Sequence, residues 1–392
     1  MRTQVGIIGA GPAGLFLAHL LERAGIDCVV LEARSREYVE GRVRAGVLEQ
    51  HTVDLMDEIG CGERLHRECM IDASLDIRFL GQIIHMDMKT LSGGKVATIY
   101  GQAEVVKDLI ASRVKSGGAL LFEADAVAID NIDTNKPSIR FTYQDKNETL
   151  ECDFIAGCDG FHGVSRPAIP DGVLETYDRI FPFGWLGILS ESPPLKEMTY
   201  ANHDRGYALA SRRSPQISRL YIQCKPDEDL NLWPDERLWE ELHIRLGDED
   251  KAELREGRIF QKGVTPVRAF VAAPMQYGRL FLAGDAAHIV PPTGAKGLNL
   301  ASADIRVLAL GLTEFYRTGA TARLDRYSEV CLRRIWKAVR FSNYMTNLLH
   351  KFDEHSSFER QIQLAELDYV AGSKAAQTVI SENYVGLPFQ LD

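Results

Sequence analysis

The amino-acid sequence predicts a mixed α/β fold, in which a mostly parallel βαβ domain is followed by an inserted antiparallel sheet and a helical C-terminal part. Three observations predict this arrangement. An apolar, β-rich run over 3–8 leads through a glycine-rich turn into a periodic helix and a second strand. Aromatic, alternating sequence over 181–223 is typical of antiparallel strands. Helical periodicity then dominates from about residue 299 to the end.

The length of 392 residues exceeds the usual size of one domain, so several domains are expected. We assign 1–175 to a dinucleotide-binding domain and 176–275 to a β-rich substrate-binding domain. The remainder, 276–392, is predicted to carry a second cofactor motif and then a helical interface region. Charged sequence over 235–256 predicts a helix inside the second domain.

Composition and charge exclude several classes of function. A hydrophobic content of 45% and a charged content of 26% are ordinary for a globular protein. The net charge of -10 argues against a nucleic-acid partner, which needs a basic surface. No apolar run is long enough for a membrane span, and the apolar stretch near the start is broken by glycines, as in a folded element. The 7 cysteines form no CxxC pair, so we expect free thiols in the cytoplasm and no metal site.

The first motif is "GAGPAG", which places Gly9, Gly11 and Gly14 in G-x-G-x-x-G spacing between a strand and a helix. Such glycines permit a tight turn and a close approach of the backbone to a pyrophosphate at the helix N-terminus. Glu32 follows at the end of the second strand, where a carboxylate can accept hydrogen bonds from ribose hydroxyls. A purely structural turn is the alternative. The complete strand–helix–strand–acid pattern favours dinucleotide binding.

The second motif is "LAGDAAHIVPPTGAKGLN" over 282–299, in which a buried strand ends on Asp285. A carboxylate at this position suits a second polyol, and the loop after it offers backbone N–H groups to a polar cofactor. Asp285 as a simple helix N-cap is the alternative. A nicotinamide dehydrogenase would explain the first motif but gives no reason for the second.

A carboxylate-binding face is predicted in the middle of the chain. On one strand Leu209, Ser211 and Arg213 share a face because side chains alternate, and Tyr221 lies on the next predicted strand. An arginine there can form a bidentate pair with a carboxylate. From spacing alone, a solvent-facing polar stripe explains the pattern as well.

These motifs resemble the single-component FAD-dependent aromatic hydroxylases. The resemblance covers essentially the whole chain and implies that 4-hydroxybenzoate is hydroxylated at its 3-position with NAD(P)H and O2. The segments that carry it are "GAGPAG", Glu32, "GRVRAGVLEQ" (41–50), "SGGK" (92–95), "YGQ" (100–102), "CDGFHGVSR" (158–166), "PFGWLG" (182–187), "YANHDRGYALASRRS" (200–214), "GDAAHIVPPTGAKGLN" (284–299) and "ENYVGLP" (382–388).

The resemblance assigns a tightly bound FAD to residues from both motifs and from the segment 42–47. Among them, Arg44 is a fixed cation suited to a pyrophosphate, although a solvated surface arginine is the alternative. The implied cofactor residues are Gly9, Gly11, Gly14, Glu32, Arg42, Val43, Arg44, Ala45, Gly46, Val47, Gln102, Asp285, Leu298 and Asn299.

The resemblance also assigns the substrate site. Ser211, Arg213 and Tyr221 would bind the carboxylate, and Tyr200 and the carbonyl of Pro292 would meet the phenol. Tyr384 would continue a chain of hydrogen bonds from Tyr200, so that these two tyrosines are the catalytic residues. Hydroxylation by an oxygenated flavin is electrophilic, and the phenol, with an ordinary pKa near about 10, therefore needs help to ionise.

One residue departs from the family pattern at the outer end of this proton relay. Members commonly have a histidine there, whereas this chain has Asp72. A carboxylate titrates at a lower pH than imidazole. The sequence therefore predicts a relay with an altered pH profile.

A surface groove is implied for the reducing pyridine nucleotide, because the sequence holds no second Rossmann unit for it. The resemblance places Tyr38, His162, Arg166 and Arg268 there. The segment "ARSREY" (33–38) supplies two further arginines for a 2′-phosphate, so NADPH is expected, although its glutamate leaves NADH open. A homodimer is likewise implied by resemblance.

Three alternatives stay open at this point. The same chemistry could act on a neighbouring aromatic acid, such as 4-aminobenzoate or a dihydroxybenzoate, since Met198 and Met275 could alter the shape of the pocket. The chain could be an FAD oxidoreductase that does not hydroxylate. It could also be a nicotinamide dehydrogenase or a flavin-retaining binding protein without turnover.

Overall fold

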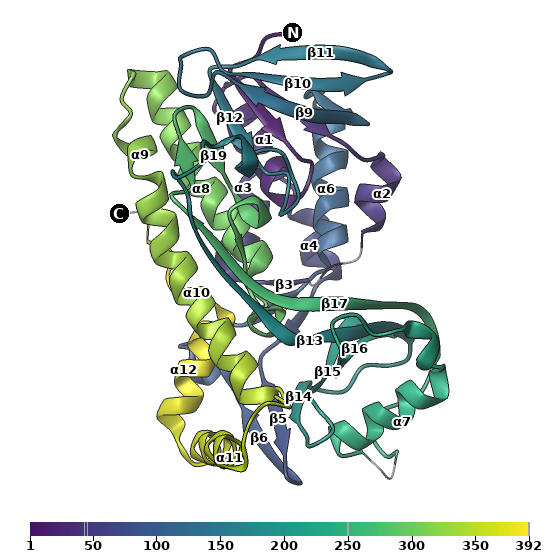
Figure 1. Cartoon of the computed structure of the whole chain (residues 1–392). Coiled ribbons are helices and arrows are strands. Elements are labelled where there is room, and N and C mark those ends of the chain that lie inside the picture. The colour runs from purple at the N-terminus through teal and green to yellow at the C-terminus, as the bar shows by residue number, and fades with distance from the viewer. Residues whose placement is uncertain (43, 45, 249–250, 391–392) are drawn as a thin grey trace.

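The computed structural model describes residues 1–42, 44, 46–248 and 251–390. Figure 1 shows two parts: one around a parallel sheet with α1, α6 and α8, and one around an antiparallel sheet with α7. The long strands β13 and β17 run from one part into the other, and the helix α10 lies alongside both. None of the helices in the described ranges is long and apolar enough to cross a membrane.

The first sheet has the predicted βαβ beginning. Its order is β18-β19-β12-β1-β2-β8, in which only β18 pairs antiparallel. All residues of β1 are buried, as expected of a central parallel strand. The bounds are β1 Val5–Ile8, β2 Cys28–Glu32, β8 Leu120–Phe122, β12 Phe154–Gly157, β18 Gln276–Tyr277 and β19 Leu280–Leu282.

The second sheet has the order β20-β17-β13-β16-β15-β14-β5-β6 and is antiparallel except between β14 and β5. Strands β5 and β6 come from within 1–175, so the first predicted range contributes to both sheets. The bounds are β5 Leu75–Phe79, β6 Gln82–Met86, β13 Glu175–Glu191, β14 Met198–Asn202, β15 Ala208–Ser214, β16 Ile217–Cys224, β17 Arg258–Ala273 and β20 His288–Ile289.

Two small antiparallel sheets and the helices complete the fold. The small sheets are β3 Val47–Leu48, β7 Ala97–Ile99 and β4 Met70–Asp72, and β9 Ala124–Asp130, β10 Ser138–Tyr143 and β11 Lys146–Glu151. The helices are α1 Pro12–Arg23, α2 Arg36–Gly41, α3 Gln50–Glu58, α4 Glu63–Glu68, α5 Met88–Leu91, α6 Gln102–Lys115, α7 Asp235–Leu246, α8 Gly297–Thr318, α9 Ala322–Asp325, α10 Tyr327–Leu349, α11 Ser357–Gly372 and α12 Lys374–Val385.

The helix predicted over 235–256 is shorter than expected. Helix α7 ends at Leu246 because Gly247 adopts the left-handed conformation, with φ of 67°. The carboxylate of Asp248 then accepts backbone N–H groups from 252–254 and shapes a loop in place of further helical turns. The charged composition of the segment thus reflects an exposed loop as well as a helix.

Two hydrophobic cores matter for the functional site. The first lies between the parallel sheet and its helices and includes Met275, so this methionine packs in a different core from Tyr200. The second joins the antiparallel sheet to α10, α11 and α12 and includes Met198, Tyr200 and Tyr384. The C-terminal helices thus pack against the face of the sheet that carries the predicted substrate residues.

Candidate cofactor and substrate site

The glycines of the first motif differ in what surrounds them. A Cβ on Gly9 would lie 2.4 Å from the Cys158 carbonyl oxygen, and one on Gly14 would lie 2.0 Å from the Gly9 carbonyl oxygen. Both therefore allow close packing of the strand and helix. No atom lies within 4 Å of the position of a Cβ on Gly11. The turn is thus open at Gly11, the residue before α1, as a site for a pyrophosphate must be.

Glu32 is held against this turn from the end of β2. One carboxylate oxygen accepts the Ala10 N–H at 2.8 Å, and the other accepts the Arg34 N–H at 2.9 Å. The side chain is only partly buried, so lone pairs remain for a ribose hydroxyl.

The second motif leaves Asp285 exposed between buried Gly284 and Ala286. The turn is fixed from α8 by Asp304, which accepts the Gly284 N–H at 3.0 Å and pairs with His288 at 2.6 Å. Burial opposes charge on His288, but Asp304 outweighs it and raises the pKa of this histidine. An exposed carboxylate on a rigid, buried turn suits a polar ligand group.

Gly46 lies against the start of α6. A Cβ on Gly46 would lie 2.4 Å from Gly101 Cα, so the backbones of these two segments are in direct contact. Burial lowers the pKa of Arg44, and the nearby Asp285 carboxylate acts in the opposite direction. The predicted cofactor residues Arg44, Gln102 and Asp285 thus belong to one region, whereas Val43 and Ala45 lie outside the described residues.

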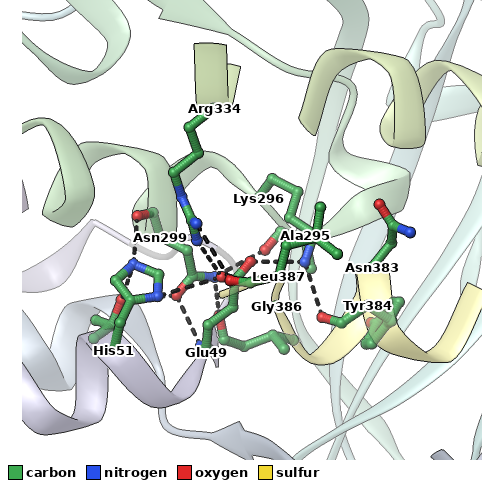
Figure 2. A network of polar contacts seen from close by, with 12 residues as sticks. Glu49, His51, Ala295, Lys296, Asn299, Arg334, Asn383, Tyr384, Gly386 and Leu387 are labelled. Atoms are coloured by element: carbon green, nitrogen blue, oxygen red, sulfur yellow. Dashed lines mark hydrogen bonds and ion pairs between the residues drawn. The ribbon is translucent and has the colours of Figure 1, made fainter. Parts of the chain in front are cut away.

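Figure 2 shows the buried carboxylate of Glu49 surrounded by side chains from distant parts of the chain. Lys296 donates to one oxygen and Arg334 to the other, each at 2.7 Å. Lys296 also donates to the Tyr384 carbonyl at 2.9 Å, and Arg334 to the Leu387 carbonyl at 3.3 Å. Burial alone would raise the pKa of Glu49, but Lys296 and the other cations hold it well below its usual range.

Asn299 completes this network on the side of the predicted flavin. Its side-chain oxygen accepts the Glu49 N–H at 2.8 Å (Figure 2). Its amide donates to the Val47 carbonyl at 2.9 Å. Leu298 precedes it on the first turn of α8 and is half-buried. The structure therefore brings Asn299 to the residues Val47 and Glu49, with Leu298 next to it in the chain.

Arg213 is a partly buried guanidinium with no hydrogen bond or ion pair to any residue that the structure describes. Burial lowers its pKa, and the neighbouring Arg219 adds to the effect. Its guanidinium fills the space beside Gly101. It lies at a bulge in β15, so the simple alternation predicted for this strand breaks before it. Tyr221 is near enough to influence it.

Ser211 and Arg219 are paired across the two strands of this face. The Ser211 hydroxyl donates to the Arg219 carbonyl at 2.9 Å, and the Arg219 guanidinium donates to the Arg44 carbonyl at 2.6 Å. Sequence reasoning missed Arg219, although it lies two residues before Tyr221 and so shares its face. It also missed Glu49 and Lys296, although both stand inside motifs that carry the resemblance.

Tyr200 and Tyr384 lie at the other end, buried and 3.1 Å apart between their hydroxyl oxygens. The Tyr200 hydroxyl also lies 3.2 Å from the Thr293 carbonyl, whereas the neighbouring Pro292 carbonyl accepts the Ala295 N–H. Met198 accepts the Tyr384 hydroxyl through sulfur at 3.2 Å. Burial raises the pKa of Tyr200, so it is protonated at neutral pH.

Asp72 is buried at the end of β4, and its carboxylate lies 3.2 Å from the Arg212 guanidinium. Burial raises its pKa to about 6, against the opposing effect of Arg212. Its charge influences both Tyr200 and Tyr384, but no described hydrogen bond joins it to either. Its part in a proton relay stays a prediction.

The predicted nucleotide residues occupy two places. Arg166 and Arg268 both lie over the Phe161 ring, with guanidinium carbons 4.4 and 4.2 Å from its centroid. The guanidinium of Arg166 already makes hydrogen bonds within the protein, because it donates to the Ala286 and Phe161 carbonyls. His162 is exposed beside them, and Tyr38 is exposed on α2 under Arg34.

A family model described as "FAD binding domain" matches residues 2–342. The chain is 47% identical to the p-hydroxybenzoate hydroxylase of Acinetobacter baylyi over 392 residues, which is 100% of this chain and 97% of that protein.

Two solved structures share the fold. The p-nitrophenol 4-monooxygenase PnpA of Pseudomonas putida matches with a TM-score of 0.82 at 21% identity, over 98% of this chain and 99% of that one. A ternary complex of aklavinone-11 hydroxylase with FAD and aklavinone matches with a TM-score of 0.74 at 21% identity, over 89% of this chain and 69% of that one. At such identities the likeness concerns the fold alone.

The open space at Gly11 gives a test that separates cofactor binding from folding. We expect Gly11→Ala to leave the melting temperature of the apoprotein unchanged and to weaken FAD binding at least about tenfold, because its methyl group occupies the approach to the turn. Gly14→Ala should instead lower the melting temperature, since its Cβ meets the Gly9 carbonyl. Gly263→Ala, also in open space, should change neither. Equal FAD affinity in Gly11→Ala and the parent protein would contradict the assignment.

Proposed function

Because the chain belongs to the FAD-binding domain family and resembles a p-hydroxybenzoate hydroxylase over its full length, we propose that it hydroxylates 4-hydroxybenzoate at the 3-position. The products are 3,4-dihydroxybenzoate and water, and the co-substrates are NADPH and O2. FAD fits the residues present, because the glycine turn is open at Gly11 and the exposed carboxylate of Asp285, on a rigid turn, lies near Arg44.

The observation that carries this proposal is the unpaired guanidinium of Arg213. A partly buried cation that forms no ion pair is costly even with the Glu104 carboxylate nearby, and a bound carboxylate lowers that cost. Tyr221 lies beside it, and Arg219 adds further positive charge. The site therefore favours an anion, and the aromatic residues around it favour an aromatic acid.

The hydroxyl pair of Tyr200 and Tyr384 would serve the phenol end of the substrate. Because burial keeps Tyr200 protonated, its hydroxyl would donate a hydrogen bond to the phenolate oxygen rather than act as a strong base. The phenol proton would leave along the two hydroxyls, which are 3.1 Å apart. Both tyrosines are buried, which keeps bulk water from the reacting ring.

The residues of both motifs, with Arg44 and Asn299, would hold FAD. When bound, this cofactor accepts two electrons from the nicotinamide and activates dioxygen for attack on the ring. NADPH rather than NADH is supported by Arg34, which is exposed over Tyr38. Arg36 contributes less than expected, because it already pairs with Glu40 at 2.6 Å. The free state of all 7 cysteines agrees with a cytoplasmic location.

Replacing Arg213 tests the proposal. Arg213→Gln is expected to raise the dissociation constant of 4-hydroxybenzoate by about 30- to 100-fold, since it removes a charge-assisted bidentate contact. Arg213→Lys should fall between it and the parent protein. Titration of flavin absorbance with substrate measures both. Arg140→Gln, which removes a surface arginine paired with Asp130, is the control. Unchanged affinity in Arg213→Gln would refute the carboxylate site.

The raised pKa of Asp72 predicts a specific pH dependence. A carboxylate accepts a proton only when ionised, so proton release from the bound phenol should fall as the pH drops through about 6. Asp72→Asn should abolish this inflection and slow the release. Stopped-flow measurement of substrate ionisation against pH detects the change. Asp76→Asn on the adjacent β5, where Asp76 pairs with the exposed His85, is the control. An inflection that persists in Asp72→Asn would remove this residue from the relay.

A homodimer formed through α11 is the quaternary structure we propose. Phe358, Ile362 and Tyr369 leave 73%, 58% and 59% of their surface exposed on this helix, whereas Leu367 and Val370 pack inward. Such an exposed apolar stripe favours association. Ile362→Asp should halve the mass measured by analytical ultracentrifugation without loss of FAD. A parent protein that sediments as a monomer would contradict the dimer.

A further inference from the structure

Arg268 is held by a single carboxylate at the cofactor end of two long strands. Its Nε donates to Asp178 at 2.7 Å, and its Nη2 donates to the other oxygen of the same carboxylate. Its remaining nitrogen, Nη1, makes no hydrogen bond with any residue in the described ranges. The guanidinium therefore keeps one free edge while its face covers the Phe161 ring at 4.2 Å.

The place of this pair in the fold ties it to the cofactor region. Asp178 lies on β13 and Arg268 on β17, and Phe270 of β17 pairs with Ile289, which belongs to the second cofactor motif. Arg166, close enough to influence Arg268, donates to the Ala286 carbonyl of the same motif. Two guanidinium groups on one aromatic ring make a surface that attracts phosphate groups.

Asp178 opposes that attraction. Arg268 holds the pKa of Asp178 below its ordinary value, so the carboxylate is charged at neutral pH. Both partners remain partly exposed, with 36% and 28% of their side-chain surfaces accessible, and a pair of this kind contributes little to stability. A fixed negative charge beside a guanidinium that faces a phosphate would instead weaken the binding of that phosphate.

We propose that Asp178 sets the affinity of the surface groove for the pyridine nucleotide, keeping Arg268 in place while weakening its hold on the nucleotide phosphates. This inference rests on the proposed function, which puts the reducing nucleotide beside Arg268. A weakened hold allows the oxidised nucleotide to leave after hydride transfer. The class of ligand is a phosphorylated dinucleotide, and Asp178 is a positioning residue that acts through Arg268.

The same two strands provide a matched control. At their far ends Glu191 of β13 and Arg258 of β17 form a pair through the same two guanidinium nitrogens, Nε and Nη2. Glu191→Gln thus removes a similar carboxylate from a similar cross-strand pair away from the cofactor. Any general effect of losing such a pair appears in both variants.

Isothermal titration of the FAD-loaded protein with NADP+ tests the inference without requiring turnover. Asp178→Asn should lower the dissociation constant of NADP+ by about three- to tenfold at low salt and by less at high salt, because ions screen the removed charge. The Michaelis constant for NADPH should fall by a similar factor, and that for 4-hydroxybenzoate should stay constant. Glu191→Gln should match the parent protein.

An unchanged or raised dissociation constant in Asp178→Asn would overturn the inference, since Asp178 would then be only an anchor for Arg268. An equal fall in Glu191→Gln would overturn it as well, because the effect would be one of net charge. Failure of the proposed function is a separate result. It would appear as tight NADP+ binding with no 3,4-dihydroxybenzoate formed by the parent protein.

Discussion

The buried carboxylate of Glu49 is the constraint on which the geometry of the site depends. It is only 3% exposed, and a carboxylate removed from water is tolerated only with partners that compensate for its lost hydration. Those partners are Lys296 from the start of α8 and Arg334 from α10, which also hold the carbonyls of the C-terminal turn (Figure 2). Even a Cβ on Gly386 would lie 2.4 Å from the Glu49 carboxylate, so the turn fits in one position.

This arrangement joins the predicted cofactor region to the two tyrosines predicted to be catalytic. Glu49 follows the predicted cofactor segment and is bonded through its N–H to Asn299, whereas the cation that neutralises it holds the carbonyl of Tyr384. The position of the Tyr384 hydroxyl is therefore linked to the region expected to hold the flavin. At the other end of the site, Arg213 has no such compensation among the described residues, and a substrate carboxylate would provide it.

Much of this could be predicted from the sequence, because the strongest signals are local. Glycine spacing, an acid after the second strand and the alternating stretch each depend on neighbouring residues, and the corresponding strands are present in both sheets. Contacts between distant segments could not be predicted in the same way. The insertion of β5 beside β14, the bulge at Arg213 and the Glu49 network form only when distant segments come together in the folded protein. The predicted helix was longer than α7, because the charge pattern alone does not reveal that Gly247 adopts the left-handed conformation.

The most direct measurement of the central claim follows flavin reduction and product in one experiment. The FAD-loaded protein is mixed anaerobically with NADPH, with and without 4-hydroxybenzoate, and oxygen is then admitted. We expect fast loss of the yellow flavin absorbance only when the phenol is present, followed by formation of 3,4-dihydroxybenzoate. Reduction that is equally fast without the phenol, or oxygen consumption without this product, would contradict it.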